Sequence, residues 1–175
     1  MNWIKRTERL AYNGWRKILR KTFLLPNGKE EDFDVLHAGD YATIAAFTAQ
    51  QEAILVYQYR PGPERILSSF VEGAIDAGET PEEAAKRELL EESGYQAKRI
   101  LPLKQQPSSY TSQTQHCFLA LDCEKVAAQQ LDDNEFIEVR LMPLKAFERF
   151  VKDASETSFV NTASALLALD HLNNR

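Results

Sequence analysis

The segment between Gly73 and Gly94 limits what this chain can fold into more than any other part of the sequence. It reads G-x5-E-x7-R-E-U-x-E-E-x-G, where U is an aliphatic residue, here Leu89. At typical residue frequencies of about 5–7% each, seven fixed residues at this spacing arise by chance in one short chain about once in a million or less. The pattern therefore indicates a specific structure.

The middle of this segment is predicted to be a helix. Thr80 is suited to the N-cap, Pro81 to the first helical position and Glu83 to a reciprocal hydrogen bond three residues after the cap. The residues up to Glu92 include many good helix formers, and Gly94 is a suitable C-cap. One helix with a defined residue at each end is therefore expected.

Three carboxylates lie on one side of this predicted helix. At 100° per residue, Glu88, Glu91 and Glu92 fall within an arc of about 100°. Like charges at these spacings cost a few tenths of a kcal/mol each in water, and more when water is removed. Two interpretations follow: an acidic face in solvent, or a site for a hard cation such as Mg²⁺ or Mn²⁺, which prefers carboxylate oxygens. The spacing of the whole segment favours the cation site.

The segment resembles the Nudix box, the signature of the Nudix hydrolase family. The resemblance implies an α/β/α sandwich and the metal-dependent hydrolysis of a nucleoside diphosphate linked to another group. It implies Mg²⁺ as the cofactor, with Mn²⁺ as an alternative, and counts Arg87 and Glu91 among the catalytic residues. Glu88, Glu91 and Glu92 match the metal-binding carboxylates of the family, and Glu72 matches a residue that donates its backbone carbonyl to the metal. Glu79 and Arg87 match an ion pair that orients the helix, and Glu79 is a further candidate metal ligand.

The residues on either side of the box resemble one branch of the family, the ADP-ribose pyrophosphatases and nucleoside-diphosphate-sugar hydrolases. The matching segments are 37–44, 54–61, 135–139 and 142–144. In that branch, Arg60 matches an arginine that reaches the substrate phosphates, and Arg65 from the same loop is a weaker candidate. The alternative for Arg60 is an arginine in solvent on a strand edge.

A loop before the terminal helices carries, in this branch, a glutamate that orients or deprotonates the attacking water. Glu135 matches it best, and Asp133 and Glu138 are alternates. The alternative interpretation is that this segment is an acidic loop without a catalytic role. Trp15 is a candidate to stack on the nucleobase, although a tryptophan is more often a core residue.

The sequence also departs from this branch. Residues 69–73 read Ser-Phe-Val-Glu-Gly where the branch has Glu-Leu-Pro-Ala-Gly, and Tyr110 stands where ADP-ribose enzymes carry a proline. The expected reaction splits a nucleoside diphosphate sugar into a nucleoside monophosphate and a sugar phosphate, with ADP-ribose, other ADP-sugars, GDP-sugars and UDP-sugars open. Two alternatives are a Nudix hydrolase for nucleoside triphosphates or capped RNA, and a sensor that binds nucleotide sugars without cleaving them.

The order of the other elements favours an α+β fold with a mixed sheet. Pro26-Asn27-Gly28 is a strong turn signal and predicts a hairpin. Residues 1–40 are expected to form an N-terminal antiparallel β arm for homodimerisation, and residues 41–175 the Nudix domain. The predicted strands are 15–24, 32–37, 41–47, 53–59, 66–71, 95–103, 115–123 and 136–142, and the predicted terminal helices are 143–152 and 161–172.

Charge and composition exclude several classes of protein. The formal charge of −5 over 175 residues argues against non-specific binding of nucleic acids. Residues 71–95 hold eight acidic and two basic side chains, a net −6, and the other 18 acidic and 19 basic residues sum to +1, so bound divalent cations would cancel most of the charge. No apolar run is long enough to span a membrane, and no secretory signal is visible. Cys117 and Cys123 are expected to be reduced core residues, as in a cytoplasmic protein, and the expected partner is a small-molecule nucleotide sugar.

Overall fold

The computed structural model describes residues 2–174, which divide into two compact units. The first unit comprises the residues up to 40 together with 106–115, and the second comprises 41–105 together with the residues from 116 onwards. Segment 106–115 belongs to the first unit, although it lies within the range predicted for the Nudix domain.

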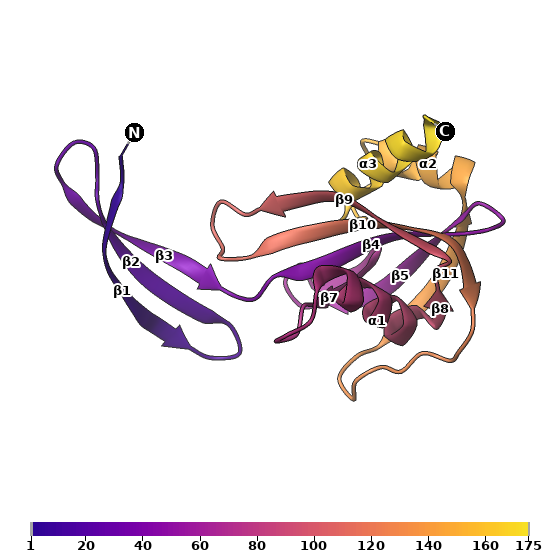
Figure 1. The fold of residues 1–175 in the computed structure, drawn as a ribbon, viewed down its shortest axis with the longest axis horizontal. Helices are drawn as coiled ribbons and strands as arrows, with labels where there is room; N and C mark the ends of the chain where they lie inside the picture. Colours follow the sequence, from indigo (N-terminus) through magenta and orange to yellow (C-terminus); the bar gives the residue numbers. More distant parts are fainter. Residues whose placement is uncertain (1, 175) are drawn as a thin grey trace. The chain divides into compact units, whose positions relative to one another are not determined.

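Three antiparallel strands form the sheet of the first unit: β1 (Ile4–Asn13), β2 (Lys17–Leu24) and β3 (Glu30–His37), in the order β1-β2-β3 (Figure 1). The predicted hairpin is confirmed, and Gly28 in its turn has a φ of 80°, which glycine adopts at low cost. β1 is an additional strand that apolar patterning could not reveal, because every residue in it is exposed. Trp15 lies in the turn between β1 and β2, outside the strand predicted for it.

Apolar side chains remain uncovered on this sheet. Trp3, Phe23 and Phe33 pack against one another with ring centroids 5.4–6.0 Å apart. Tyr12 and Trp15 are 58% and 88% exposed. None of the described residues of the first unit is fully buried, so its sheet has no closed core.

A larger sheet and three helices make up the second unit. Its strands are β4 (Tyr41–Thr48), β5 (Glu52–Arg60), β6 (Arg65–Ser69), β7 (Val71–Ala74), β8 (Tyr95–Gln96), β9 (Arg99–Pro107), β10 (Thr114–Lys125) and β11 (Ile137–Pro143), of which β9 ends and β10 begins within segment 106–115. Its helices are α1 (Pro81–Ser93), α2 (Leu144–Lys152) and α3 (Thr162–Asn173). The strand order is β11-β5-β4-β10-β8, with β6 added to β5, β7 to β4 and β9 to β10.

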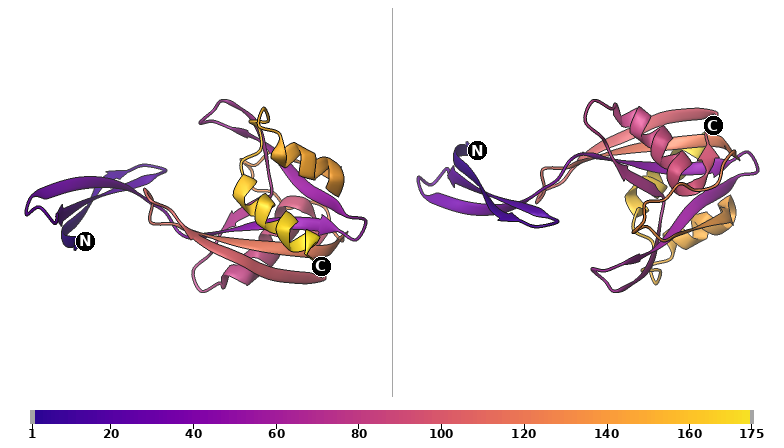
Figure 2. Two further views of the ribbon diagram at one scale, coloured as in Figure 1. Left: turned by 90° about the horizontal axis from the view of Figure 1, so that it is seen from above. Right: turned by 90° about the horizontal axis from the view of Figure 1, so that it is seen from below.

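Side chains alternate along β4 between two hydrophobic clusters, as expected for a strand that is buried on both faces. Ile44 packs in one cluster with Leu89 of α1. Phe47 packs in the other with Phe147 of α2 and Ala165 of α3. Figures 1 and 2 show α1 on one face of the sheet and α2 and α3 on the opposite face. The α/β/α sandwich is therefore confirmed.

The prediction of a single strand over residues 66–71 was wrong. The chain forms β6, which pairs with β5, and then β7, which pairs with β4. Phe70 stands between the two strands and is fully buried. Periodicity alone could not reveal this division, because the residues stay extended while their hydrogen-bonding neighbour changes. The change of neighbour brings residues 72–74 beside α1.

Two further predictions are confirmed by the second unit. Cys117 and Cys123 are buried free thiols in β10, six positions apart in one strand. Helix α2 starts directly after Pro143, which is its N-cap residue. None of the described helices is long and apolar enough to cross a membrane.

Candidate active site

Helix α1 begins with the capping arrangement that the sequence predicts. Thr80 Oγ1 accepts a hydrogen bond from Glu83 N (3.2 Å), and Glu83 Oε2 accepts one from Thr80 N (2.8 Å). Pro81 occupies the first turn. These contacts satisfy two backbone donors that have no partner within the helix. They fix where α1 starts, and therefore which way its later carboxylates face.

A close backbone contact fixes the other end of α1. Gly94 has a φ of 75°, and its N–H donates to Leu90 O (2.8 Å). A Cβ at this position would lie 2.3 Å from Ala127 O, so only glycine fits. Val126 N and Ala127 N both donate to Gly94 O, at 2.9 and 3.2 Å. The loop that follows β10 is therefore bound to the C-terminal end of the helix.

Two consecutive glutamines continue this attachment. Gln130 N donates to Glu91 O (2.8 Å), and Gln129 Nε2 donates to both Glu92 O (2.6 Å) and Ile137 O (3.1 Å). Sequence patterns do not reveal this role of Gln129, because one of its two acceptors, Glu92 O, lies 37 positions away. The contacts hold the loop beside the carboxylates of α1.

Glu135 is the acidic residue of this loop that acts on the cluster electrostatically. After burial, its negative charge is among the causes that raise the pKa of both Glu88 and Glu92. The two alternates lie in other surroundings: Asp133 is exposed, and Glu138 is exposed and paired with Arg140 (2.8 Å). The effect on the pKa of Glu88 and Glu92 thus favours Glu135 over both alternates.

Gly73 allows the closest approach between β7 and α1. A Cβ on Gly73 would lie 1.7 Å from Glu88 Cδ and 1.9 Å from Glu88 Oε1, so the carboxylate occupies the space that a side chain would need. One residue earlier, Glu72 N donates to Glu92 Oε2 over 3.4 Å. The first glycine of the box is therefore needed so that the helix carboxylates can reach the strand backbone.

Arg87 lies at the centre of the charged network. Its Nε and Nη2 donate to the two carboxylate oxygens of Glu79, each at 2.9 Å, and Nη2 also donates to Ala74 O (2.9 Å). Its Nη1 donates to Glu88 Oε1 (2.7 Å) and Glu91 Oε2 (3.0 Å). These hydrogen bonds, led by the one to Glu79, raise the pKa of Arg87 above its ordinary value. The ion pair expected from the sequence is present.

Glu92 is the most deeply buried carboxylate of α1, with 8% of its surface exposed. Burial, and after it the negative charge of Glu88, raises the pKa of Glu92 to about 8. Burial also raises the pKa of Glu88, although Arg87 acts in the opposite direction. Carboxylates held in this way keep their charge only beside a positive group.

The donor set of this cluster fits a hard divalent cation. Glu88, Glu91 and Glu92 offer only carboxylate oxygens, the ligands that Mg²⁺ and Mn²⁺ prefer. Among the described residues, no group of three or more His, Cys, Asp or Glu side chains is already arranged to hold a metal ion. Arg87 bonds one oxygen of Glu88 and one oxygen of Glu91, and leaves the second oxygen of each carboxylate without a bond to the guanidinium.

The side chain of Glu72 has partners away from this cluster. Its Oε1 accepts hydrogen bonds from Thr43 Oγ1 (2.8 Å) and from Asn161 Nδ2 (2.6 Å), at the start of α3. Burial raises the pKa of Glu72, which these two bonds and the positive charge of Arg60 oppose. Sequence reasoning missed Thr43 and Asn161. An asparagine before a helix predicts a cap, and nothing local links it to a residue 89 positions earlier.

The two arginine candidates differ in what their side chains already bind. Arg60 is half-buried at the end of β5, and its positive charge acts to lower the pKa of Glu72. Arg65 stands opposite Arg60 in the sheet, but its guanidinium donates to Thr157 O (2.7 Å) and Thr157 Oγ1 (3.3 Å). Arg60 is therefore the better placed of the two to bind a further anion.

Trp15 lies in the first unit. It is 88% exposed, which excludes the core role considered for it, and the guanidinium carbon of Arg16 lies 4.6 Å from its ring centre. The two side chains line a cavity of about 450 Å³ within this unit, together with Lys17, His37, Ala38 and Gly39. Its lining combines one aromatic ring with two cationic side chains, Arg16 and Lys17, which suits an anionic aromatic ligand.

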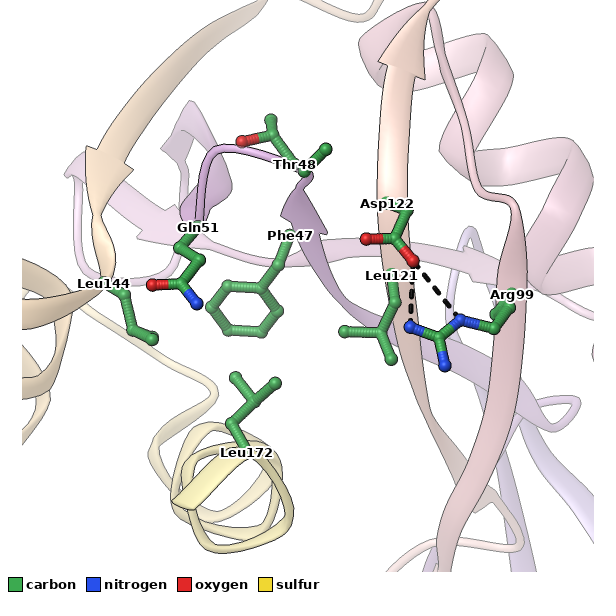
Figure 3. A pocket seen from close by; sticks show the side chains of 9 residues that line it. Phe47, Thr48, Gln51, Arg99, Leu121, Asp122, Leu144 and Leu172 are labelled. Carbon is green, nitrogen blue, oxygen red and sulfur yellow. Dashed lines mark hydrogen bonds and ion pairs between the residues drawn. The ribbon is translucent and has the colours of Figure 1, made fainter. Parts of the chain in front are cut away.

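A separate cavity of about 350 Å³ lies where β4 ends (Figure 3). Phe47, Leu121 and Leu172 form its apolar part, and Arg99 and Asp122 form an ion pair of 2.8 Å on its wall. None of the box carboxylates lines it. This cavity is therefore not the site of the chemistry expected from the box.

Comparison with known proteins finds a matching family model and several relatives. A model of the NUDIX domain matches residues 39–161. The ADP-ribose pyrophosphatase of Bacillus subtilis (strain 168) is 31% identical over 145 residues, which cover 81% of this chain and 78% of that protein. The ADP-ribose pyrophosphatase of Saccharomyces cerevisiae is 32% identical over 164 residues, covering 82% and 69%. A crystal structure of an ADP compounds hydrolase shares the fold, with a TM-score of 0.84 at 21% identity over 99% of this chain and 96% of that one.

Proposed function

This chain belongs to the NUDIX domain family of pyrophosphohydrolases, and we propose that it cleaves the diphosphate bond of a nucleoside diphosphate sugar in a reaction that requires a divalent cation. The products are a nucleoside monophosphate and a sugar phosphate. The observation that carries this proposal is the cluster of Glu88, Glu91 and Glu92 on α1, in which Glu88 fills the space over Gly73 and Glu92 accepts from Glu72 N. Relatives named ADP-ribose pyrophosphatase and ADP-sugar pyrophosphatase support the choice of substrate class.

The cation is Mg²⁺ in this proposal, with Mn²⁺ as the alternative. Glu88, Glu91 and Glu92 would hold it, together with the backbone carbonyl of Glu72. When bound, such an ion neutralises charge on the diphosphate and lowers the pKa of a bound water. The buried, mutually repelling carboxylates support this assignment, because a cation removes the electrostatic cost of holding them together.

Other residues bind and orient the reacting groups. Arg60 binds a phosphate of the substrate, and Arg65 has the weaker claim because Thr157 already binds its guanidinium. Glu135 orients or deprotonates the attacking water, which its position in the loop attached to α1 supports. Trp15 stacks on the nucleobase, which its exposure and the basic cavity around it support.

We also propose that residues 1–40 form the contact of a homodimer. The sheet of this unit leaves Trp3, Tyr12 and Trp15 at least 47% exposed and contains no fully buried residue among those described. Exposed apolar surface of this kind marks a contact with another protein. The oligomeric state at micromolar concentration, measured by sedimentation, tests this.

A substrate panel tests the proposed reaction. Initial rates with ADP-ribose, GDP-mannose, UDP-glucose, dGTP and capped RNA are compared in Mg²⁺. The proposal expects the highest kcat/KM for a nucleotide sugar, with equimolar nucleoside monophosphate and sugar phosphate. Preference for dGTP or capped RNA would contradict it, and tight binding of a nucleotide sugar without product would identify a sensor.

A further inference from the structure

The backbone N–H of Phe70, in the segment that leads into the box, finds its acceptor on a side chain outside the sheet. Phe70 lies between β6 and β7, where the chain changes its pairing partner from β5 to β4. It is fully buried, so water cannot bind its N–H, and an unpaired buried donor costs about 1–3 kcal/mol. Asn161 Oδ1 accepts this hydrogen bond at 2.8 Å.

The same side chain also binds the next polar group along the strand. Asn161 Nδ2 donates to Glu72 Oε1 at 2.6 Å, and Thr43 Oγ1 donates to the same oxygen at 2.8 Å. Asn161 is 7% exposed. One buried amide therefore joins α3 both to the backbone at residue 70 and to the side chain at residue 72.

Helix capping does not account for this residue. Asn161 is the N-cap residue of α3, a position where asparagine commonly binds the backbone of the first turn. Its side chain makes no such capping bond, and its oxygen and nitrogen are both directed to the strand. The amide thus contributes to the position of β7 and not to the start of the helix.

The position of β7 matters because the box carboxylates meet it on the other side. Glu72 N donates to Glu92 Oε2 at 3.4 Å, and the Glu88 carboxylate fills the space over Gly73. Any shift of residues 72 and 73 changes the spacing between this backbone and both carboxylates.

We propose that Asn161 is a positioning residue of the cation site, which sets the distance between the β7 backbone and the carboxylates of α1. This inference rests on the proposed function, since it assigns Asn161 to the same site. Residues that orient metal ligands typically change metal affinity 10–100-fold when they are removed.

Mn²⁺ binding to the full chain, measured by the loss of the free-ion EPR signal, tests the inference without using activity. The variant Asn161→Ala is expected to bind Mn²⁺ at least 10-fold more weakly than the wild type. Ser164→Ala is the matched control, because Ser164 is 2% exposed in the same helix and its hydroxyl contacts Cys117 Sγ of β10 (3.2 Å) and not a residue of β7. It is expected to lose stability but to keep its affinity for Mn²⁺.

A charge-conserving exchange keeps the test decisive if Asn161→Ala does not fold. Asn161→Asp places a second carboxylate against Glu72 and should weaken Mn²⁺ binding. Adding Glu72→Gln places an amide donor at residue 72 opposite the new carboxylate at residue 161. The double variant should therefore regain most of the affinity for Mn²⁺. Equal Mn²⁺ affinity in the wild type and in Asn161→Asp would overturn the role of Asn161. The same conclusion would follow if Asn161→Asp bound Mn²⁺ weakly and the double variant bound it just as weakly.

A third variant separates this inference from the proposed function. Glu92→Gln should lose the Mn²⁺ binding that the wild type shows. If Glu92→Gln binds Mn²⁺ as well as the wild type does, the proposed cation site itself is wrong, and the role of Asn161 is wrong with it. If Glu92→Gln loses binding while both Asn161 variants keep it, only the inference about Asn161 is wrong.

Discussion

Arg87 and Glu79 are joined by two hydrogen bonds of 2.9 Å each, from Nε to Oε1 and from Nη2 to Oε2. This paired geometry matches a planar guanidinium and cannot be reproduced by a lysine. Because Arg87 also binds Glu88 and Glu91, the pair connects the loop before α1 to two of the carboxylates. The orientation of the helix and the charge balance of the cluster therefore depend on the same side chain.

Arg87→Lys should lower both stability and turnover. Losing several hydrogen bonds between charged groups that are mostly shielded from water should reduce the free energy of unfolding by about 1–3 kcal/mol. Turnover should fall at least 10-fold. Thermal unfolding and kcat measure the two effects. Lys86→Ala is the control, since Lys86 forms an exposed pair with Glu82 and should change stability by less than about 1 kcal/mol.

Gly73→Ala should nearly abolish activity. Its Cβ would lie 1.7 Å from Glu88 Cδ, so the carboxylate must move away from β7. We expect kcat to fall by roughly 100-fold, with weaker Mn²⁺ binding. Gly62→Ala is the control, because no atom lies within 4 Å of a Cβ at that position. If Gly73→Ala kept the wild-type kcat, catalysis would not depend on the position that the Glu88 carboxylate occupies over residue 73.

The stability of the metal-free protein should fall as the pH rises. The pKa of Glu92 is raised to about 8 in the folded state, compared with about 4.3 in an unfolded chain. The folded state therefore holds more protons than the unfolded state between these values, and the free energy of unfolding decreases with pH across that window. One such group contributes at most about 1.4 kcal/mol per pH unit. Urea unfolding from pH 5 to 8 measures the slope.

Glu92→Gln should flatten this pH dependence, because the amide does not titrate. Saturating Mg²⁺ should raise stability most at the high end of the range, where Glu92 is charged. A slope that is the same in the wild type and in Glu92→Gln would assign the effect to other groups.

Glu135→Gln should impair the chemical step more than metal binding. The amide cannot accept a proton, so kcat should fall by about 10²–10⁴-fold. Mn²⁺ affinity should stay within a few-fold of the wild type. Glu138→Gln, which removes only a surface pair with Arg140, should keep its activity. If Glu138→Gln lost turnover and Glu135→Gln did not, Glu138 and not Glu135 would be the residue that acts on the attacking water.

The sequence predicted those parts of the site whose signals are local. Helix α1 follows from the capping residues at 80 and 83 and from the glycine at 94, all within 15 positions. The bonds of Gln129 to Glu92 and of Asn161 to Phe70 and Glu72 could not be predicted, because they join residues 37 to 91 positions apart. The division of β6 from β7 was missed for a related reason, since strand pairing is a long-range property.

The most direct test of the central claim is the release of nucleoside monophosphate from ADP-ribose in the presence and absence of Mg²⁺, for the wild type, Glu91→Gln and Glu92→Gln. The products are quantified by chromatography, and circular dichroism checks that each variant is folded. We predict that the wild type releases equimolar AMP and ribose 5-phosphate only with the cation, and that both variants lose at least 99% of this rate while they stay folded. Unchanged turnover in both variants, or full wild-type turnover in excess chelator, would contradict the account.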